Sequence, residues 1–202
     1  MKETKAFYWE LLQEKLPEET LEKVQLIIKE VKVDFKISKP RKTKLGDFKV
    51  LSNMEKPQIS INENLSPYHF LVTLIHELAH YFTWIQYKNK VAPHGKEWKN
   101  NYRTLFTPIL SEIKDTRVKK MLSMHINNAR ASSFSDIDLM KLINNDTEQN
   151  IVENMPFEAY FKIGNKIYRK EKKLRKRYLC VEYHSKKKYY IHPLAKVERT
   201  EV

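Results

Sequence analysis

The stretch Leu74–Phe82 reads LIHELAHYF and places two histidines and a glutamate inside an otherwise apolar segment. The longer run YHFLVTLIHELAHYFTWIQYK has the composition and spacing of a buried helix, with Ser66 as a fitting N-cap and Pro67 at the first helical position. Residues four apart on a helix share one face. His76 and His80 are therefore expected to direct their imidazoles at the same point.

This arrangement is the His-Glu-x-x-His pattern of zinc hydrolases. Neutral imidazole nitrogens bind zinc at about 2.0–2.1 Å. Glu77 follows the first histidine, where its carboxylate is expected to reach a zinc-bound water and to remove a proton from it as general base. An isolated buried histidine is usually a hydrogen-bonded core residue, but the complete pattern on an apolar helix predicts one zinc ion per chain, with His76 and His80 as ligands and Glu77 as the catalytic residue.

A catalytic zinc site needs three protein ligands and an open position. No glycine turn with a third histidine follows His80 directly, because the sequence continues as YFTWIQYKNK. Two candidates for the third ligand stand close together further on, His94 in PHGKEW and Glu97 three residues later. The spacing alone leaves both open.

The segment IHELAHYFTWIQYKNKVAPHGKEWK resembles the SprT-like (Spartan-related) zinc metalloproteases, which pair the His-Glu-x-x-His helix with a later His-Gly-x-x-Trp/Phe element. The resemblance extends upstream through KPQISINENLSPYHFLVT and covers about residues 35–106. It favours His94 over Glu97 as the third ligand, with Gly95 and Trp98 completing the second element. It also implies peptide-bond hydrolysis and, as substrates, proteins crosslinked to DNA.

The family usually carries a C-terminal zinc ribbon with two cysteine pairs, and here the sequence departs from it. Cys180 is the single cysteine, so a four-cysteine site is excluded and no intrachain disulfide is expected. A cluster of Cys180, His184 and His192 is conceivable, although its spacing is unlike that of common zinc modules. We therefore expect a ribbon-like C-terminal region without a metal.

Positive charge is concentrated near the C-terminus. From Lys162 to Ile191 twelve Lys or Arg stand against two Glu, which is a net +10 out of the chain's formal +13. Tyrosines are interleaved with these residues on short alternating segments. Basic groups contact phosphates and aromatic rings stack on unpaired bases. The region is expected to bind nucleic acid, namely single-stranded or structured DNA, although a charge run can also be a solvated face.

Three other side chains give weaker indications of a functional role. His69 precedes His76 by seven residues and is either a support for the site or an ordinary surface or core histidine. Tyr102 and Arg103 are conceivable donors to the oxyanion that forms beside zinc. The sequence places neither of them at the site, and a solvent-facing role is the default for both.

The fold expected is α+β. Helices would pack on a small antiparallel sheet, built from VDFKIS, TKLGDFKVLSN and PQISINENL, around the active-site helix of a minimal zincin-like core. Gly46, inside the second of these strands, suggests a bulge or a bend. We expect a core over residues 1–112, a helical and polar connector over 113–154, and a basic β-rich appendage over 155–202.

The function expected from these features is a zinc endopeptidase that acts on DNA-associated proteins. Two alternatives remain, a nucleic-acid-associated zinc protein without hydrolysis and a peptidase with no DNA role. No apolar run approaches the roughly 20 residues of a membrane span, and the N-terminal residues lack a signal-peptide core. A cytoplasmic monomer without membrane contact is expected, associated with the nucleoid if the source is prokaryotic.

Overall fold

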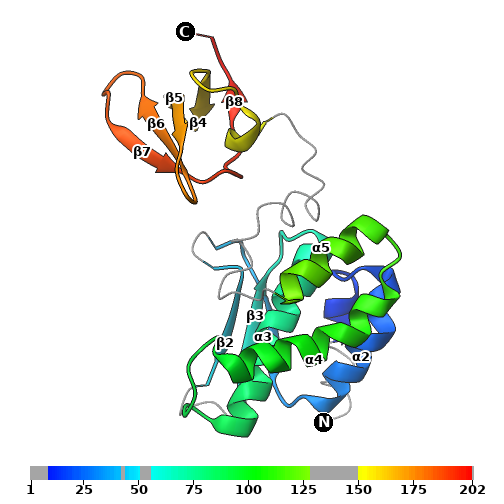
Figure 1. Ribbon diagram of the computed structural model, residues 1–202. Coiled ribbons are helices and arrows are strands. Elements are labelled where there is room, and N and C mark those ends of the chain that lie inside the picture. Colours follow the sequence, from blue (N-terminus) through cyan, green and yellow to red (C-terminus); the bar gives the residue numbers. More distant parts are fainter. Residues whose placement is uncertain (1–8, 42–43, 51–55, 128–149, 202) are drawn as a thin grey trace. The chain divides into compact units, whose positions relative to one another are not determined.

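The computed structural model describes residues 9–41, 44–50, 56–127 and 150–201. The chain divides into two compact units, residues 1–144 and 145–202 (Figure 1). Each unit is described by itself. Most of the connector expected over 113–154 lies outside the described residues, which stop at 127 and resume at 150.

The first unit begins with helical residues 9–13, and Pro17 separates them from the next helical segment. This break matches the amphipathic patterns on either side of the proline, which cannot continue a helix without losing a hydrogen bond. The elements that follow are η1 (Glu18–Thr20), α2 (Leu21–Glu30), β1 (Asp34–Ser38), β2 (Gly46–Lys49), β3 (Gln58–Asn62), α3 (Pro67–Tyr87), α4 (Lys96–Glu112) and α5 (Thr116–Asn127).

The sheet of this unit has the strand order β1-β3-β2. β2 pairs with β3 antiparallel, as expected, but β1 pairs with β3 parallel, so the prediction of an antiparallel sheet was wrong for this pair. Alternation along a strand reports which side chains are buried and carries no information on the direction of its neighbour. The predicted bulge at Gly46 is also absent, since the β2–β3 register runs without a shift from Gly46↔Ile61 to Lys49↔Gln58.

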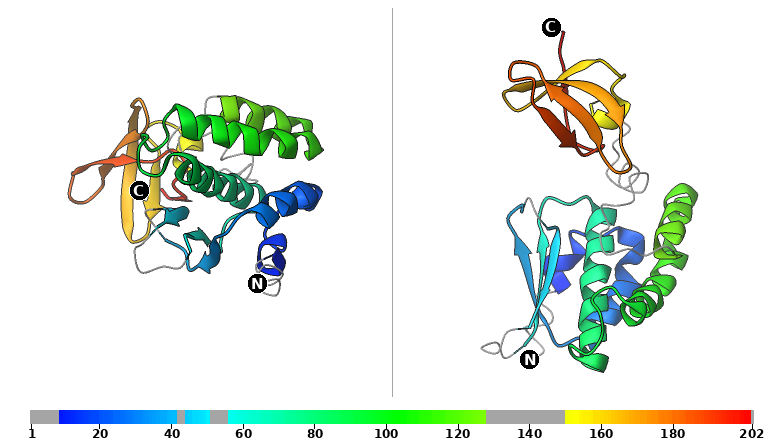
Figure 2. Two further views of the ribbon diagram at one scale, coloured as in Figure 1. Left: turned by 90° about the horizontal axis from the view of Figure 1, so that it is seen from below. Right: turned by 60° about the vertical axis from the view of Figure 1, so that its left-hand side comes forward.

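Helix α3 lies between the sheet and α4 (Figure 2). Twelve of its 21 residues are buried, which explains its nearly continuous apolar sequence. The helix starts after Ser66 with Pro67 in its first turn, as the sequence predicts. None of the helices in the described ranges is long and apolar enough to cross a membrane.

The second unit is a five-stranded antiparallel sheet with the order β7-β6-β5-β4-β8. Its elements are η3 (Val152–Asn154), β4 (Tyr160–Ile163), β5 (Lys166–Lys173), β6 (Tyr178–Glu182), β7 (Lys188–Ile191) and β8 (Glu198–Arg199). One face of the sheet packs on the segment around η3 and holds a core that includes Phe161, Tyr168, Tyr178 and Cys180. This unit therefore has an apolar core of its own, and Cys180 is part of it.

Candidate metal centre

The Nε2 atoms of three histidines converge. The separations are 3.3 Å between His76 and His80, 2.9 Å between His80 and His94, and 3.1 Å between His94 and His76. The two histidines of α3 are one helical turn apart, and His94 approaches them from the loop before α4. In the parts of the chain that the structure describes, these residues form the one group of three or more His, Cys, Asp or Glu side chains arranged to hold a metal ion.

The donor set fits a tetrahedral metal. Ligand nitrogens about 2.0–2.1 Å from a common tetrahedral centre lie roughly 3.3–3.4 Å apart, and the observed separations are close to this. Burial lowers the pKa of His76 to about 2 and of His80 to about 4, with a contribution from the neighbouring histidines, and burial also lowers the pKa of His94. All three imidazoles are therefore neutral at pH 7, which is the form that binds a metal.

Trp98 forms the floor under the three imidazoles. Its ring centroid is 4.7 Å from those of His76 and His94 and 5.5 Å from that of His80, and the residue is fully buried. Tyr102 stacks beneath it at a centroid distance of 5.1 Å. This aromatic column from α4 restricts the rotamers of the histidines, so the cluster is preorganised by packing.

The loop that carries His94 has an unusual backbone. His94 has a φ of 59°, in the left-handed region that non-glycine residues rarely adopt. The next residue, Gly95, donates its backbone N–H to Ala92 O at 2.9 Å, and a Cβ at Gly95 would lie 2.9 Å from the same oxygen. The glycine of the His-Gly pair thus permits the tight turn that aims His94 at α3.

The other candidates near the helix do not join the cluster. Glu97 lies in the first turn of α4 and is not among the grouped side chains. His69 is buried in α3 at 5% exposure and is likewise outside the group. Tyr102 is buried under Trp98, and Arg103 donates to the backbone oxygen of Asn127 at 3.0 Å. Neither therefore faces the point where the three imidazoles meet.

Glu77 is buried beside the cluster at 7% exposure. Burial, and then the negative charge of Asp47, raises the pKa of Glu77 to about 8, opposed by the charge of Arg41 and by a hydrogen bond from the backbone N–H of Phe48. A dication held by the three imidazoles would favour the carboxylate form. The structure thus places Glu77 directly after His76 on α3, with its carboxylate buried against β2.

Strand β2 supplies the surroundings of Glu77. Gly46 lies so close that a Cβ there would meet the Glu77 carboxylate and stand 2.7 Å from Thr73 Cγ2. Phe48 packs edge-on against Tyr81 at a centroid distance of 6.4 Å. The available signal was the glycine inside a strand pattern, which marks a close approach as often as a bulge.

Asn62, at the end of β3, holds the segment that enters β2. Its amide donates to the backbone oxygens of Arg41 and Lys44, at 3.3 and 3.1 Å, and its Oδ1 accepts from Arg41 Nε at 2.8 Å. The side chain is 1% exposed. Asn62 therefore helps to set where β2 begins, and with it the position of Gly46 against α3.

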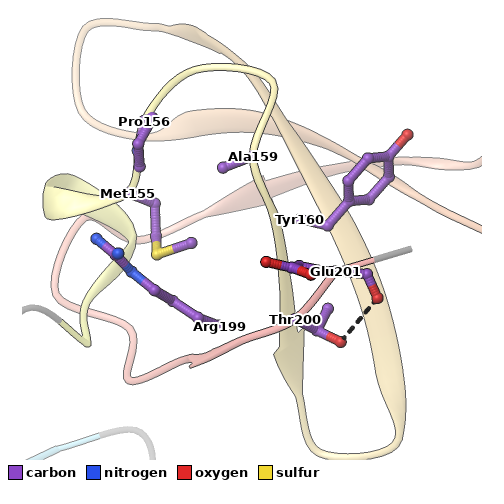
Figure 3. A pocket seen from close by; sticks show the side chains of 7 residues that line it. All are labelled: Met155, Pro156, Ala159, Tyr160, Arg199, Thr200 and Glu201. Atoms are coloured by element: carbon purple, nitrogen blue, oxygen red, sulfur yellow. Dashed lines mark hydrogen bonds between the residues drawn. The ribbon is translucent and has the colours of Figure 1, made fainter.

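The C-terminal unit shows no comparable cluster in its described residues. Cys180 is buried in the apolar core, and Cys180, His184 and His192 are not among the side chains grouped to hold a metal. A surface hollow of about 760 Å³ is lined by Met155, Pro156, Ala159, Tyr160, Arg199, Thr200 and Glu201. The Tyr160 ring points away from the Arg199 guanidinium (Figure 3). The hollow therefore lacks converging polar groups.

The SprT-like family model matches residues 11–118, which is more than half of the chain and includes every residue of the histidine cluster. The match begins well upstream of the motifs and ends in the first turn of α5. No curated protein and no solved structure matches the chain. The chain belongs to the SprT-like family, which is of the zinc metalloprotease kind.

Proposed function

We propose that this protein is a zinc-dependent endopeptidase in which His76, His80 and His94 hold one zinc ion and Glu77 is the general base. The observation that carries the proposal is the convergence of three Nε2 atoms within 3.3 Å of one another. Glu77 directly follows His76 on the same helix and is buried at 7% exposure. Imidazole is a preferred zinc donor, and three histidines leave one tetrahedral position for water or substrate.

The chain's own groups have distinct parts in the reaction. Bound zinc supplies Lewis acidity, which polarises the scissile carbonyl and acidifies the attacking water. Glu77 takes the proton of that water and can return it to the leaving amine. The backbone of β2, through the N–H of Phe48, orients the Glu77 carboxylate. Trp98 and the apolar faces of α3 keep bulk water from the buried side of the site.

A purely structural zinc site is the alternative. Such sites are closed by four protein ligands and need no general base. In the described ranges no fourth His, Cys, Asp or Glu joins the three histidines. The buried carboxylate of Glu77 costs stability without contributing a ligand, which favours a catalytic role.

Replacing Glu77 by Gln tests the proposal, because the change keeps the shape and removes the basicity. Zinc content measured by atomic absorption should stay near one per chain. Cleavage of an unfolded protein such as casein should fall by about 10²–10⁴-fold, the usual contribution of general-base catalysis. Equal cleavage by the two proteins would exclude Glu77 as the base. Loss of zinc from the variant would mean that the substitution disturbs the fold of the metal site, so that the cleavage rates would not report on the base.

The substrate class we propose is protein bound or crosslinked to DNA, with the C-terminal unit contacting the nucleic acid. The face of its sheet opposite the apolar core carries the cross-strand row Tyr160–Arg169–Val181–Lys188 and the neighbouring row Lys172–Leu179–Tyr190. Tyr190 is 60% exposed. Tyrosine rings and basic groups share this face, the combination that binds single strands through stacking and phosphate contacts. Arg169 is also paired with Glu171 at 2.6 Å.

A binding titration tests this partner. A fluorescent single-stranded oligonucleotide should bind with an affinity that falls as salt rises, with a log–log slope of about −0.7 per phosphate contacted. Tyr190→Ala should weaken binding, while Phe157→Ala, a change of a similarly exposed ring outside these rows, should leave it unchanged. If DNA neither binds nor accelerates cleavage of a DNA-binding protein, while casein is still cleaved, the activity is that of a general peptidase.

A further inference from the structure

A cavity of about 350 Å³ opens beside the histidine cluster. His80 and His94 form one of its walls, so it is continuous with the point where the three Nε2 atoms meet. β2, the second half of α3, the loop before α4 and the start of α4 contribute the remaining walls. Ligand pockets run from about 300 to 1,000 Å³, so this one has room for a single side chain.

Most of the wall residues are apolar, while Lys88, Asn89 and the two imidazoles add polar groups. The rings of Phe48, Trp84 and Trp98 line the cavity, together with the aliphatic loop residues Val91, Ala92 and Pro93. Thr83 donates its hydroxyl to Ala79 O at 2.7 Å and accepts from Asn101 Nδ2 at 3.0 Å, so its hydrogen-bonding capacity is used. None of the described lining residues is acidic.

One cation stands among the residues that line the cavity. The Lys88 ammonium lies 4.0 Å from the centroid of the Trp84 ring, a cation–π distance. Lys88 is exposed, and its φ of 53° directs the chain away from α3. A lysine or arginine side chain entering the cavity would approach this ammonium without a carboxylate to pair with.

The wall formed by the loop is fixed before any ligand arrives. The backbone N–H of Lys88 donates to Trp84 O at 2.8 Å, that of Lys90 to Tyr87 O at 3.1 Å and that of Gly95 to Ala92 O at 2.9 Å. These hydrogen bonds tie the start of the loop, at Lys88 and Lys90, and its end, at Gly95. A preformed apolar cavity binds a matching side chain without the cost of ordering its own walls.

We propose that this cavity is the specificity pocket of the peptidase and takes a large apolar side chain, such as Phe or Leu, of the residue that flanks the scissile bond. The inference rests on the proposed function, since the scissile carbonyl is taken to lie at the three imidazoles. The side chain next to that carbonyl then reaches the cavity directly. Small residues leave the cavity unfilled, and Lys or Arg meets Lys88.

The first test maps the cleavage sites of the zinc-loaded protein in a set of unfolded proteins, by mass spectrometry of the new termini. Large apolar residues should be enriched at one of the two positions that flank the cleaved bond, and Lys and Arg depleted there. Val91→Trp, which fills the cavity, should shift this position towards Gly and Ala. Ile85→Trp adds the same ring at an exposed site of α3 outside the cavity and should keep the wild-type preference.

The second test measures binding without cleavage. Phenylalanine, leucine, glycine and lysine hydroxamates carry one metal-binding group and differ in side chain, and their affinities can be followed by tryptophan fluorescence. Burying a Phe side chain contributes enough for phenylalanine hydroxamate to bind roughly 10–100-fold more tightly than glycine hydroxamate. Val91→Trp should abolish this ratio, whereas Ile85→Trp should preserve it.

The outcomes separate the pocket from the proposed function. The pocket would be overturned, and the peptidase left intact, by cleavage that Glu77→Gln abolishes but that shows no residue preference at either flanking position. Equal affinities for all four hydroxamates would have the same meaning. Absence of both cleavage and hydroxamate binding in the zinc-loaded protein would overturn the proposed function and the pocket together.

Discussion

Gly46 of β2 and Glu77 of α3 touch so closely that no side chain fits between them. A Cβ at Gly46 would overlap the Glu77 carboxylate and approach Glu77 Cγ to 2.8 Å. Contacts this short do not occur for real side chains, so either β2 or the Glu77 rotamer would have to move. Glycine is needed here for close approach, since its neighbours form a regular strand without a register shift.

Gly46→Ala is therefore expected to lower kcat by at least tenfold while KM changes little, because the displaced carboxylate loses its alignment more than the pocket loses its shape. Zinc content should remain near one per chain, since Gly46 supplies no ligand side chain and the nearest atoms to a Cβ there belong to Glu77 and Thr73. Gly164→Ala is the control for glycine replacement outside the site. A Cβ at Gly164 meets no atom within 4 Å, and the strain from its φ of 59° falls in the turn between β4 and β5 of the other unit, so kcat should stay at the wild-type value. A wild-type kcat in Gly46→Ala would mean that β2 shifts to accommodate the added Cβ and that the glycine does not position Glu77.

The third ligand can be tested by comparing two neighbouring substitutions. His94→Ala removes one of three converging imidazoles and should reduce zinc content sharply after dialysis against a weak chelator. Glu97→Ala should leave it unchanged, because Glu97 is outside the group of ligand atoms. The opposite pattern would show that the loop rearranges when zinc binds.

The metal-free protein should have a stability maximum near pH 6.5. The pKa of Glu77 is raised from 4.5 to about 8, so its contribution to stability is complete below pH 4.5 and is lost as the pH rises through 8. The pKa values of His76 and His80 are lowered from 6.5 to about 2 and 4, so their contributions are complete above pH 6.5 and are lost as the pH falls. Between pH 4.5 and 6.5 the gain from the two histidines exceeds the loss from Glu77, and above pH 6.5 only the loss from Glu77 remains.

Urea unfolding of chelator-treated protein between pH 5 and 8 measures this profile. Glu77→Gln removes the carboxyl group that causes the loss of stability above pH 6.5, so the free energy of unfolding should become nearly constant from pH 6.5 to 8. The wild type should lose up to about 1.4 kcal/mol per pH unit in the same range, the value for one proton. Parallel profiles of the two proteins would show that the carboxyl of Glu77 does not retain a proton there.

Lys170 is expected to be the internal cation that stabilises the C-terminal unit. The side chain is 2% exposed, donates to the backbone oxygens of Glu153 and Met155 at 3.0 and 2.6 Å, and lies 4.0 Å from the Tyr178 ring centroid. Lys170→Met leaves these buried oxygens without that donor and should destabilise the unit by about 1–3 kcal/mol. Hydrogen exchange of β5 amides measures the effect.

Lys172→Met is the matched control for this substitution, since Lys172 is an exposed residue of the same strand. It should change the exchange rates little, because surface substitutions usually shift stability by less than about 0.5 kcal/mol. Equal protection of β5 in the wild type and in Lys170→Met would mean that the ammonium costs as much to bury as its contacts contribute.

The His-Glu-x-x-His spacing largely determined the local part of the site. Four residues make slightly more than one helical turn, so His76 and His80 had to share a face wherever the helix was placed. Ser66 and Pro67 likewise predicted where α3 begins, because both act on the first turn alone. The alternation of apolar and polar residues predicted most of the strands of both units, because this alternation is a local property of the sequence.

Tertiary structure alone decided how these elements meet. The parallel pairing of β1 with β3 and the approach of Gly46 to Glu77 join segments far apart in sequence, and no local period encodes them. Spacing left His94 and Glu97 as equal candidates, and the left-handed turn at His94 separates them by aiming the imidazole at α3. The cavity beside His80 exists only because one strand, two helices and a loop are packed together, so its shape depends on the whole unit and on no single segment.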